Sequence, residues 1–273
     1  MNNKIYVITG ATSGIGKRLV EILAKDNVVF AGYRSEKKIE ELAKISDNVI
    51  PFYVDYAKPE TVKPAIDFIR TKTDKIDRLI NIAGCVVAGP VETIAIDEIR
   101  RQFDVNVFGH IEIAQGLVDI LNNGRIINVS SMASYAIFPF ISPYCASKRA
   151  LDIFFNSFAI ENKRNIKVIS IKPGVISTPL WEKSIQENTE AIQNCSGYEK
   201  EMEFLAQNAR KNQEKGLDVD RVVNTILKAD NSIKPYLTYT VGNDAFCAHM
   251  ISKLPQKLIN KLIKFGLVLR MKK

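Results

Sequence analysis

The chain has 273 residues, of which 46% are hydrophobic and 25% are charged, a composition typical of a globular protein with a substantial apolar core. Intrinsic disorder is therefore excluded, and no run reaches the ~18 consecutive apolar residues needed to span a bilayer. The net charge of +8 lies mostly at the end of the chain, because Ala245 to Lys273 contain no acid and carry +7. We expect a catalytic α/β domain over 1–245 and a basic amphipathic tail over 246–273.

Short apolar runs rich in β-branched residues recur along the chain, with helix-like stretches between them. The seven runs are Ile5–Thr9, Val28–Ala31, Val49–Val54, Leu79–Ala83, Ile126–Ser130, Val168–Lys172 and Leu237–Val241. Continuous apolar runs are typical of parallel strands buried on both faces. The pattern predicts one Rossmann-type domain, a doubly wound parallel seven-stranded sheet with helices on both faces.

A glycine-rich segment, Thr9-Gly10-Ala11-Thr12-Ser13-Gly14-Ile15-Gly16, follows the first run and opens the first helix. Glycines let the backbone turn sharply and approach a pyrophosphate, and a helix N-terminus offers unpaired N–H groups to that anion. The spacing is GxxxGxG and not the GxGxxG of the general fingerprint. The segment predicts a dinucleotide site, and a plain strand–helix turn is the alternative.

The end of the second run indicates which dinucleotide is preferred. NAD sites usually place an acid here for the ribose 2′-hydroxyl, and NADP sites an arginine for the 2′-phosphate. No acid occurs from Val28 to Ser35, and Arg34 can present a bidentate guanidinium to a phosphate. Arg34 therefore favours NADP(H), unless it is only a solvated surface arginine.

Tyr144 and Lys148 form a candidate catalytic pair. On a helix, residues four apart share a face, and a nearby cation stabilises a phenolate and lowers its pKa. Ser131 ends a predicted strand, at the edge where ligands bind in open α/β sheets. Without Ser131, the pair would be read as a packed tyrosine beside an exposed lysine. His110 is isolated from other histidines and cysteines, and we expect it to have a structural role.

After Pro173-Gly174, about forty residues pass before the next helical stretch at Asp220–Leu227. Long connections are usually lids or binding segments, so we expect a substrate lid at about 179–216, with a surface helical hairpin as the alternative. Its apolar residues are Trp181, Ile185, Ile192, Tyr198 and Phe204.

Taken in order, these features resemble the short-chain dehydrogenase/reductase family in its compact single-domain form, over Lys4 to about Ala245. The resemblance is carried by TGATSGIG at 9–16, Asp55 after the third strand, NIAG at 81–84, Asn106 in VNVFG, the serine pair at 130–131, YCASK at 144–148 and KPGVIST at 172–178. It implies an oxidoreductase that moves a hydride between NADP(H) and an alcohol/carbonyl pair.

The resemblance also implies the catalytic roles. Tyr144 would be the general acid in reduction and the base in oxidation, while Lys148 would bind the nicotinamide ribose and lower the pKa of Tyr144. Ser131, thirteen positions before the tyrosine, would polarise the substrate oxygen. Asn106 would hold the water that connects Lys148 to solvent.

The residues implied to bind the cofactor are Gly10, Thr12, Ser13, Gly14, Ile15, Gly16, Arg34, Asp55, Asn81, Ala83, Gly84, Tyr144, Lys148, Pro173, Val175 and Thr178. Asp55 is expected near the adenine, Asn81 and Ala83 near the adenosine ribose, and Val175 and Thr178 near the nicotinamide amide.

The sequence also departs from the family pattern. Ile82 and Ser134 replace an asparagine and a glycine that are common in the family, and Ser13 stands where some NADP-dependent members have a basic residue. The NADP preference therefore depends on Arg34, and NAD(H) stays an alternative.

Apolar residues at Ser134–Phe140 and in the 179–216 segment favour a lipophilic substrate of steroid, retinoid or acyl type, similar to the hydroxysteroid/retinol branch. A non-catalytic NADP(H)-binding regulator is the alternative function. An epimerase or dehydratase would need a larger substrate domain. We expect a cytoplasmic homodimer or homotetramer with reduced cysteines, with Cys145 as a candidate sensor, and neither metal nor nucleic acid as a ligand.

The tail alternates apolar residues with Lys253, Lys257, Lys261 and Lys264. Such a helix could contact a membrane, a neighbouring subunit or the substrate entrance.

Overall fold

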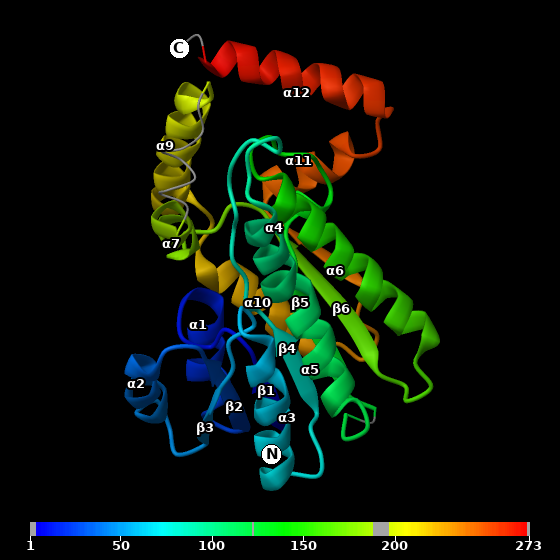
Figure 1. Cartoon of the computed structure of the whole chain (residues 1–273). Helices are drawn as coiled ribbons and strands as arrows, with labels where there is room; N and C mark the ends of the chain where they lie inside the picture. Colours follow the sequence, from blue (N-terminus) through cyan, green and yellow to red (C-terminus); the bar gives the residue numbers. More distant parts are fainter. Residues whose placement is uncertain (1–3, 122, 188–196, 272–273) are drawn as a thin grey trace.

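The computed structural model describes residues 4–121, 123–187 and 197–271. Its centre is one parallel sheet with the strand order β3-β2-β1-β4-β5-β6-β7 (Figure 1). The strands are β1 (Ile5–Ile8), β2 (Val28–Tyr33), β3 (Val49–Tyr53), β4 (Arg78–Asn81), β5 (Arg125–Val129), β6 (Lys167–Pro173) and β7 (Thr238–Val241). The predicted doubly wound, seven-stranded parallel sheet is confirmed.

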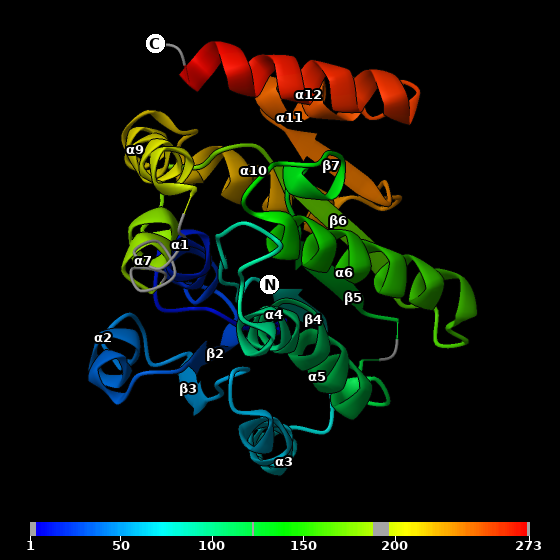
Figure 2. The same ribbon diagram turned by 45° about the horizontal axis from the view of Figure 1, so that its top comes forward.

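Helices cover both faces of the sheet and bury its apolar side chains in two cores (Figures 1 and 2). On one face lie α1 (Gly14–Leu23) and α10 (Val219–Asn231), which pack against each other through residues such as Leu19 and Val222. On the other face lie α3 (Val62–Lys72), α5 (Gly109–Leu117) and α6 (Ser142–Glu161). The short α2 (Ile39–Ala43) packs at β3, and α4 (Ile96–Phe103) runs into a π-helical turn at Asp104–Phe108.

The sheet topology brings distant motifs together at one edge. From β1 the chain adds β2 and β3 on one side of the sheet, and then adds β4 on the other side of β1. β4 pairs with β1, with Ile80 beside Ile8, and β5 pairs with β4. All strands are parallel, so the segments that follow β1, β4, β5 and β6 emerge at the same edge. This edge, at the topological switch point, is where ligands bind in open α/β sheets.

Among the described residues, four further helices lie beyond the sheet layers. The long connection after β6 contains α7 (Leu180–Glu187) and α9 (Glu199–Lys215), which pack against each other. After β7 come α11 (Asn243–Ile251) and α12 (Gln256–Met271), and α12 contacts α9. Ile192 and Cys195, which the sequence singled out, lie outside the described residues. Within the described ranges, no helix has the length and hydropathy needed to cross a membrane.

Candidate active site

A cavity of about 580 Å³ opens at the carboxyl edge of the sheet, between the sheet and the α7/α9 pair. Predicted site residues that line it are Gly10, Thr12, Ser13, Gly14, Ile15, Arg34, Asp55, Ala83, Gly84, Ser131, Tyr144, Lys148, Pro173, Val175 and Thr178. Three others, Gly16, Asn81 and Asn106, are not part of its wall. The structure thus gathers most of the predicted residues around one space.

The glycine-rich turn is as tight as its sequence predicts. Gly10 and Gly14 have φ of +68° and +50°, in the left-handed region that favours glycine. A Cβ on Gly10 would lie 2.8 Å from the backbone N of Ala83, and one on Gly16 would lie 2.2 Å from the Gly10 carbonyl oxygen. Gly16 is therefore needed for the close approach of α1 to the turn. The Ser13 side chain does not cap α1, so the first N–H groups of the helix have no side-chain cap.

Arg34 and Asp55 mark one end of the cavity. Arg34 directly follows β2, is exposed and lines the wall. Asp55 follows β3, and its Oδ1 accepts a hydrogen bond from Ala57 N at 3.1 Å. Asp55 N donates to Thr61 Oγ1 at 3.0 Å. Asp55 thus lies at the wall within an ordered turn.

Asn81 is not part of the cavity wall, although Ile82 and Ala83 are. It is the last residue of β4, pairs in register with Asn128 of β5, and its Nδ2 donates to Asn128 Oδ1 at 2.8 Å. The side chain is buried within the sheet, away from the cavity wall. Ala83, two residues later, lies on the wall instead.

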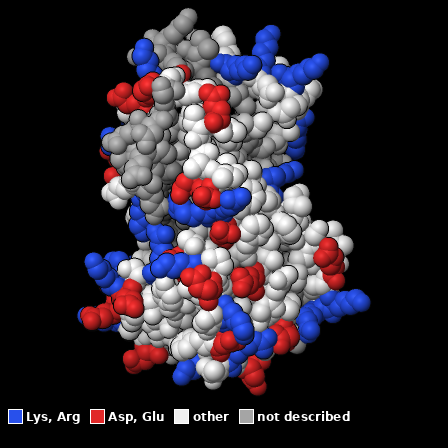
Figure 3. Space-filling model, in the orientation of Figure 1, with Lys and Arg blue, Asp and Glu red and all other residues white. Residues whose placement is uncertain are grey.

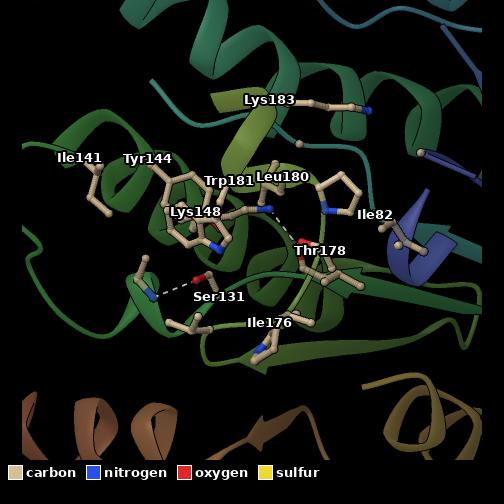
Figure 4. Close-up of a pocket in the computed structure, with 18 of the residues that line it drawn as sticks. Ile82, Ser131, Ile141, Tyr144, Lys148, Ile176, Thr178, Leu180, Trp181 and Lys183 are labelled. Carbon is tan, nitrogen blue, oxygen red and sulfur yellow. Dashed lines mark hydrogen bonds between the residues drawn. The ribbon is translucent and has the colours of Figure 1, made fainter. Parts of the chain in front are cut away.

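Ser131, Tyr144 and Lys148 face the same inner part of the cavity (Figure 4). All three are buried. Lys148 Nζ donates to Val129 O at 3.0 Å and lies 5.8 Å from the centre of the Tyr144 ring. Ser131 Oγ accepts a hydrogen bond from Ala133 N at 3.1 Å, which holds the serine at the end of β5.

The pKa values of Tyr144 and Lys148 are governed by burial. Burial raises the pKa of Tyr144 to about 12, although a hydrogen bond with Ser131 lowers it in part. Burial lowers the pKa of Lys148 to about 8, against the opposing effect of Asp152 and Cys85. The expected lowering of the Tyr144 pKa is therefore not met in this geometry, because loss of solvation outweighs the favourable contacts of the phenolate.

Asn106 sits in the π-helical turn, which Gly109 N closes by donating to Asp104 O. Its Nδ2 donates to Cys85 O at 3.1 Å and to Ser147 Oγ at 3.0 Å, and its Oδ1 accepts from Cys85 N at 2.9 Å. A Cβ on Gly84 would lie 3.4 Å from Asn106 Oδ1 and 3.6 Å from Lys148 Nζ. The side chains of Asn106 and Lys148 therefore meet at the bare backbone of Gly84.

His110 is buried behind the cavity. Its Nε2 lies 2.8 Å from Ala83 O, and its ring meets Tyr56 edge-on. Burial, helped by the Lys148 charge, lowers the pKa of His110 to about 3. The imidazole is thus neutral and donates Nε2–H to the Ala83 carbonyl, which anchors the segment after β4.

Asp152 and Lys172 form a buried ion pair that the sequence analysis missed. Asp152 Oδ2 of α6 lies 2.7 Å from Lys172 Nζ of β6, and that Nζ lies 4.3 Å from the centre of the Tyr135 ring. Asp152 stands four residues after Lys148 and therefore shares its helix face. That spacing was the only available signal, and it does not reveal burial.

None of the three described cysteines is in a disulfide. Cys85 and Cys145 are buried, whereas Cys247 is exposed. Burial raises the pKa of the Cys145 thiol, which disfavours the reactive thiolate and therefore a sensing role. Across the described ranges, no three His, Cys, Asp or Glu side chains are grouped to hold a metal ion.

Comparison with known proteins assigns the family. The family model described as short chain dehydrogenase matches residues 4–189. An uncharacterised oxidoreductase of Bacillus subtilis is 30% identical over 256 residues, which cover 89% of this chain and 90% of the relative. The NADPH-dependent 1-acyldihydroxyacetone phosphate reductase of Saccharomyces cerevisiae is 32% identical over 190 residues, covering 66% of this chain and 63% of the relative.

Among solved structures, a short-chain dehydrogenase from Streptomyces avermitilis superposes with a TM-score of 0.78 at 22% identity, covering 100% of this chain and 99% of that one. At that identity the likeness shows a shared fold. The chain belongs to the short-chain dehydrogenase family and is an oxidoreductase of that family.

Proposed function

We propose that the protein interconverts a secondary alcohol and a carbonyl compound with NADP(H), and that Tyr144 is its general acid/base. The observation that carries this proposal is the placement of three buried side chains, Tyr144, Ser131 and Lys148, on the wall of one cavity beside the end of β5. Lys148 lies on the same helix face as Tyr144. A proton donor and a second hydroxyl thus face one substrate oxygen.

The cavity has the features that a nicotinamide dinucleotide requires. The turn from Gly10 to Ile15 lines the cavity next to uncapped helix N–H groups, where a pyrophosphate would bind. Arg34 would hold a 2′-phosphate, and Asp55 and Ala83 would border the adenosine. Pro173, the last residue of β6, and Val175 and Thr178, which follow the strand, would border the nicotinamide. NADP(H) is the preferred cofactor, and the yeast relative is described as NADPH-dependent.

Each reacting group of the chain then has a separate task. The bound cofactor supplies or accepts the hydride. Ser131 donates a hydrogen bond to the substrate oxygen and holds it beside Tyr144. Tyr144 gives its phenolic proton to the developing alkoxide in reduction and takes it back in oxidation. Lys148 donates to the ribose and, with Asn106 across Gly84, connects Tyr144 to the proton supply.

The substrate side of the cavity is mainly apolar. It is formed by Phe138 and Phe140 before α6, and by Leu180, Trp181 and Phe204 from α7 and α9. Apolar walls bind lipophilic molecules and leave sugar hydroxyls unsatisfied. We infer that α7 and α9 form a substrate lid over a lipophilic carbonyl of steroid, retinoid or acyl type. The yeast relative, whose named substrate carries an acyl chain, supports this class.

We further infer a cytoplasmic homo-oligomer. Apolar side chains lie exposed on α6, with Ile153 at 54% and Phe154 at 50% exposure. A second subunit would remove them from water. Sedimentation equilibrium of the wild type beside Phe154→Ser tests this, and a monomeric wild type would contradict it.

The competing function is NADP(H) binding without turnover, as in a regulatory protein. It would need the same glycine turn and Arg34, but it has no use for two buried hydroxyls, those of Ser131 and Tyr144, on the cavity wall beside Lys148. The complete set of reacting groups therefore favours catalysis.

The deciding experiment follows NADPH and NADH oxidation against ketosteroids, retinal, acetoacetyl esters and simple ketones. We expect turnover with at least one bulky lipophilic carbonyl and a preference for NADPH. Tight NADPH binding with no turnover on any member of the panel would favour the regulatory function.

A further inference from the structure

The helix α12 carries an apolar stripe on the surface of the protein. The side chains of Leu258, Leu262 and Phe265 are 42%, 46% and 64% exposed. Their spacing of four and three residues places them on one face. A different pair, Ile259 and Ile263, faces inward, since Ile259 is buried and Ile263 is half-buried. The exposed stripe is therefore separate from the face by which α12 packs on the molecule.

A second stripe, of lysines, runs beside the first. Lys257, Lys261 and Lys264 of α12 are exposed and again recur at helical spacing, and the exposed Lys253 lies in the turn just before the helix. In the part of the chain that the structure describes, none of the four ammonium groups has an ion-pair partner. Figure 3 shows basic side chains projecting from the top edge of the molecule, where α12 lies in Figure 1.

Several basic residues elsewhere in the protein are paired with acids. On α3, for example, Lys63 Nζ lies 3.0 Å from Asp67 Oδ2, and on α4 Arg100 Nη1 lies 2.7 Å from Asp97 Oδ1. The segment from Ala245 onward has no acid at all, although it holds +7 of the net +8. The uncompensated charge and the apolar stripe thus coincide on one helix.

We propose that α12 docks the protein on an anionic lipid bilayer, lying in the plane of the membrane surface. A helix with apolar and basic stripes side by side inserts its apolar residues at the headgroup boundary while its lysines meet lipid phosphates. Sixteen residues span about 24 Å at 1.5 Å per residue, which gives the helix a long line of contact.

Charge complementarity favours an anionic bilayer over a second copy of the chain as the partner of α12. A two-fold symmetric contact through α12 would place the same lysine stripe of each subunit against its equivalent. Like charges at such an interface repel. An anionic bilayer supplies the opposite charge and an apolar layer together.

Docking through α12 would also bring the cavity close to lipid. α12 contacts α9, and α9 lines the cavity with Phe204, Leu205 and Ala209. The wall of the cavity and the docking helix are therefore neighbours. The docking proposal does not depend on which substrate the cavity takes.

The test is co-sedimentation of the full chain with two kinds of vesicles, pure phosphatidylcholine and phosphatidylcholine with about one third phosphatidylglycerol, at low and high salt. Each lysine near an anionic surface raises the binding constant about five-fold. We expect the wild type to bind only the anionic vesicles and to be released by salt. Lys257→Gln/Lys261→Gln should bind at least about ten-fold more weakly, and Leu262→Ser/Phe265→Ser should also lose binding.

Matched controls remove similar groups from the opposite edge of the sheet. Lys25→Gln/Lys163→Gln deletes two exposed lysines near strand starts, and Ile233→Ser deletes an apolar side chain that is 84% exposed in the loop before β7. Both should bind vesicles like the wild type. Circular dichroism and sedimentation equilibrium on every variant report folding and self-association.

Two results would overturn the proposal. One is a folded wild type that stays off anionic vesicles at low salt. The other is a loss of binding in the control variants as large as in the α12 variants. The wild type could fail to bind vesicles while the α12 variants change the oligomeric state. That result would show that a second copy of the chain covers this face of α12, and it would refute docking on lipid.

Discussion

Asp152 Oδ2 of α6 lies 2.7 Å from Lys172 Nζ of β6, and both side chains are buried. Asp152 is also one helical turn from Lys148, and its charge raises the pKa of Lys148. The charge of Lys148 is therefore balanced by a carboxylate that it shares with a second lysine. Neither Asp152 nor Lys172 lines the cavity.

This sharing predicts opposite effects of two substitutions on the pH profile. Lys148, with a pKa of about 8, is protonated below that pH and loses its charge above it. We expect reduction to slow as the pH rises through about 8. Asp152→Asn removes the charge that raises the Lys148 pKa, so the fall in the rate of reduction should occur at lower pH. Lys172→Met removes the cation that competes with Lys148 for Asp152, so the fall in the rate should occur at higher pH.

The measurement is kcat/KM for NADPH as a function of pH, which reports ionisations of the free enzyme. Asp67→Asn, which removes the carboxylate of an exposed Lys–Asp pair on α3, should leave the pH at which kcat/KM falls unchanged. Shifts in the same direction for Asp152→Asn and Lys172→Met would show that the pair has only a structural role.

Arg34 is predicted to discriminate between the two dinucleotides. Arg34→Ala should raise KM for NADPH about ten- to hundred-fold, since a hydrogen bond to a charged group contributes about 1.5–3 kcal/mol. KM for NADH should stay within about two-fold, because NADH lacks the 2′-phosphate.

Lys37→Ala is the matched control, since Lys37 is exposed and nearby but does not line the cavity. Steady-state kinetics with both cofactors on both variants provide the comparison. Equal losses with NADPH and NADH would refute a contact with the 2′-phosphate.

Two helical glycines should respond in opposite ways to alanine. A Cβ on Gly16 would lie 2.2 Å from the Gly10 carbonyl oxygen, so the turn must shift; a Cβ on Gly266 meets nothing within 4 Å. We expect Gly16→Ala to destabilise the fold by about 1–3 kcal/mol and to weaken NADPH binding. Gly266→Ala should stabilise it by about 0.5–1 kcal/mol. Thermal unfolding and NADPH titration measure both, and an unchanged NADPH affinity in Gly16→Ala would contradict the tight-turn account.

The sequence allowed the sheet and most of the cavity wall to be predicted, because these depend on local patterns. β-branched runs identify buried parallel strands, and the strand ends bring the motif residues to one edge. The pairing of the Asn81 amide with Asn128 of the neighbouring strand, within the sheet, was not indicated by the sequence. The π-helical turn at Asn106 also escaped prediction, because its apolar pattern resembles that of an α-helix.

Burial of charge could not be predicted from the sequence at all. The Asp152–Lys172 pair depends on how α6 packs against β6, the strand that follows it, and the sequence pattern does not indicate which side chains meet there. The same limit applied to the Tyr144 pKa. The helix spacing predicted a cation nearby, but the burial that raises the pKa to about 12 is a property of the folded molecule.

The central claim, that Tyr144 transfers the proton, is tested most directly by Tyr144→Phe in a single-turnover assay with NADPH and an accepted carbonyl. Tyr236→Phe, which alters a tyrosine that is 75% exposed, serves as the control and should match the wild type. We predict that Tyr144→Phe binds NADPH with unchanged affinity and reduces the carbonyl about 10²- to 10⁴-fold more slowly, the usual contribution of a positioned proton donor. Residual reduction above about one per cent of the wild-type rate would contradict that role.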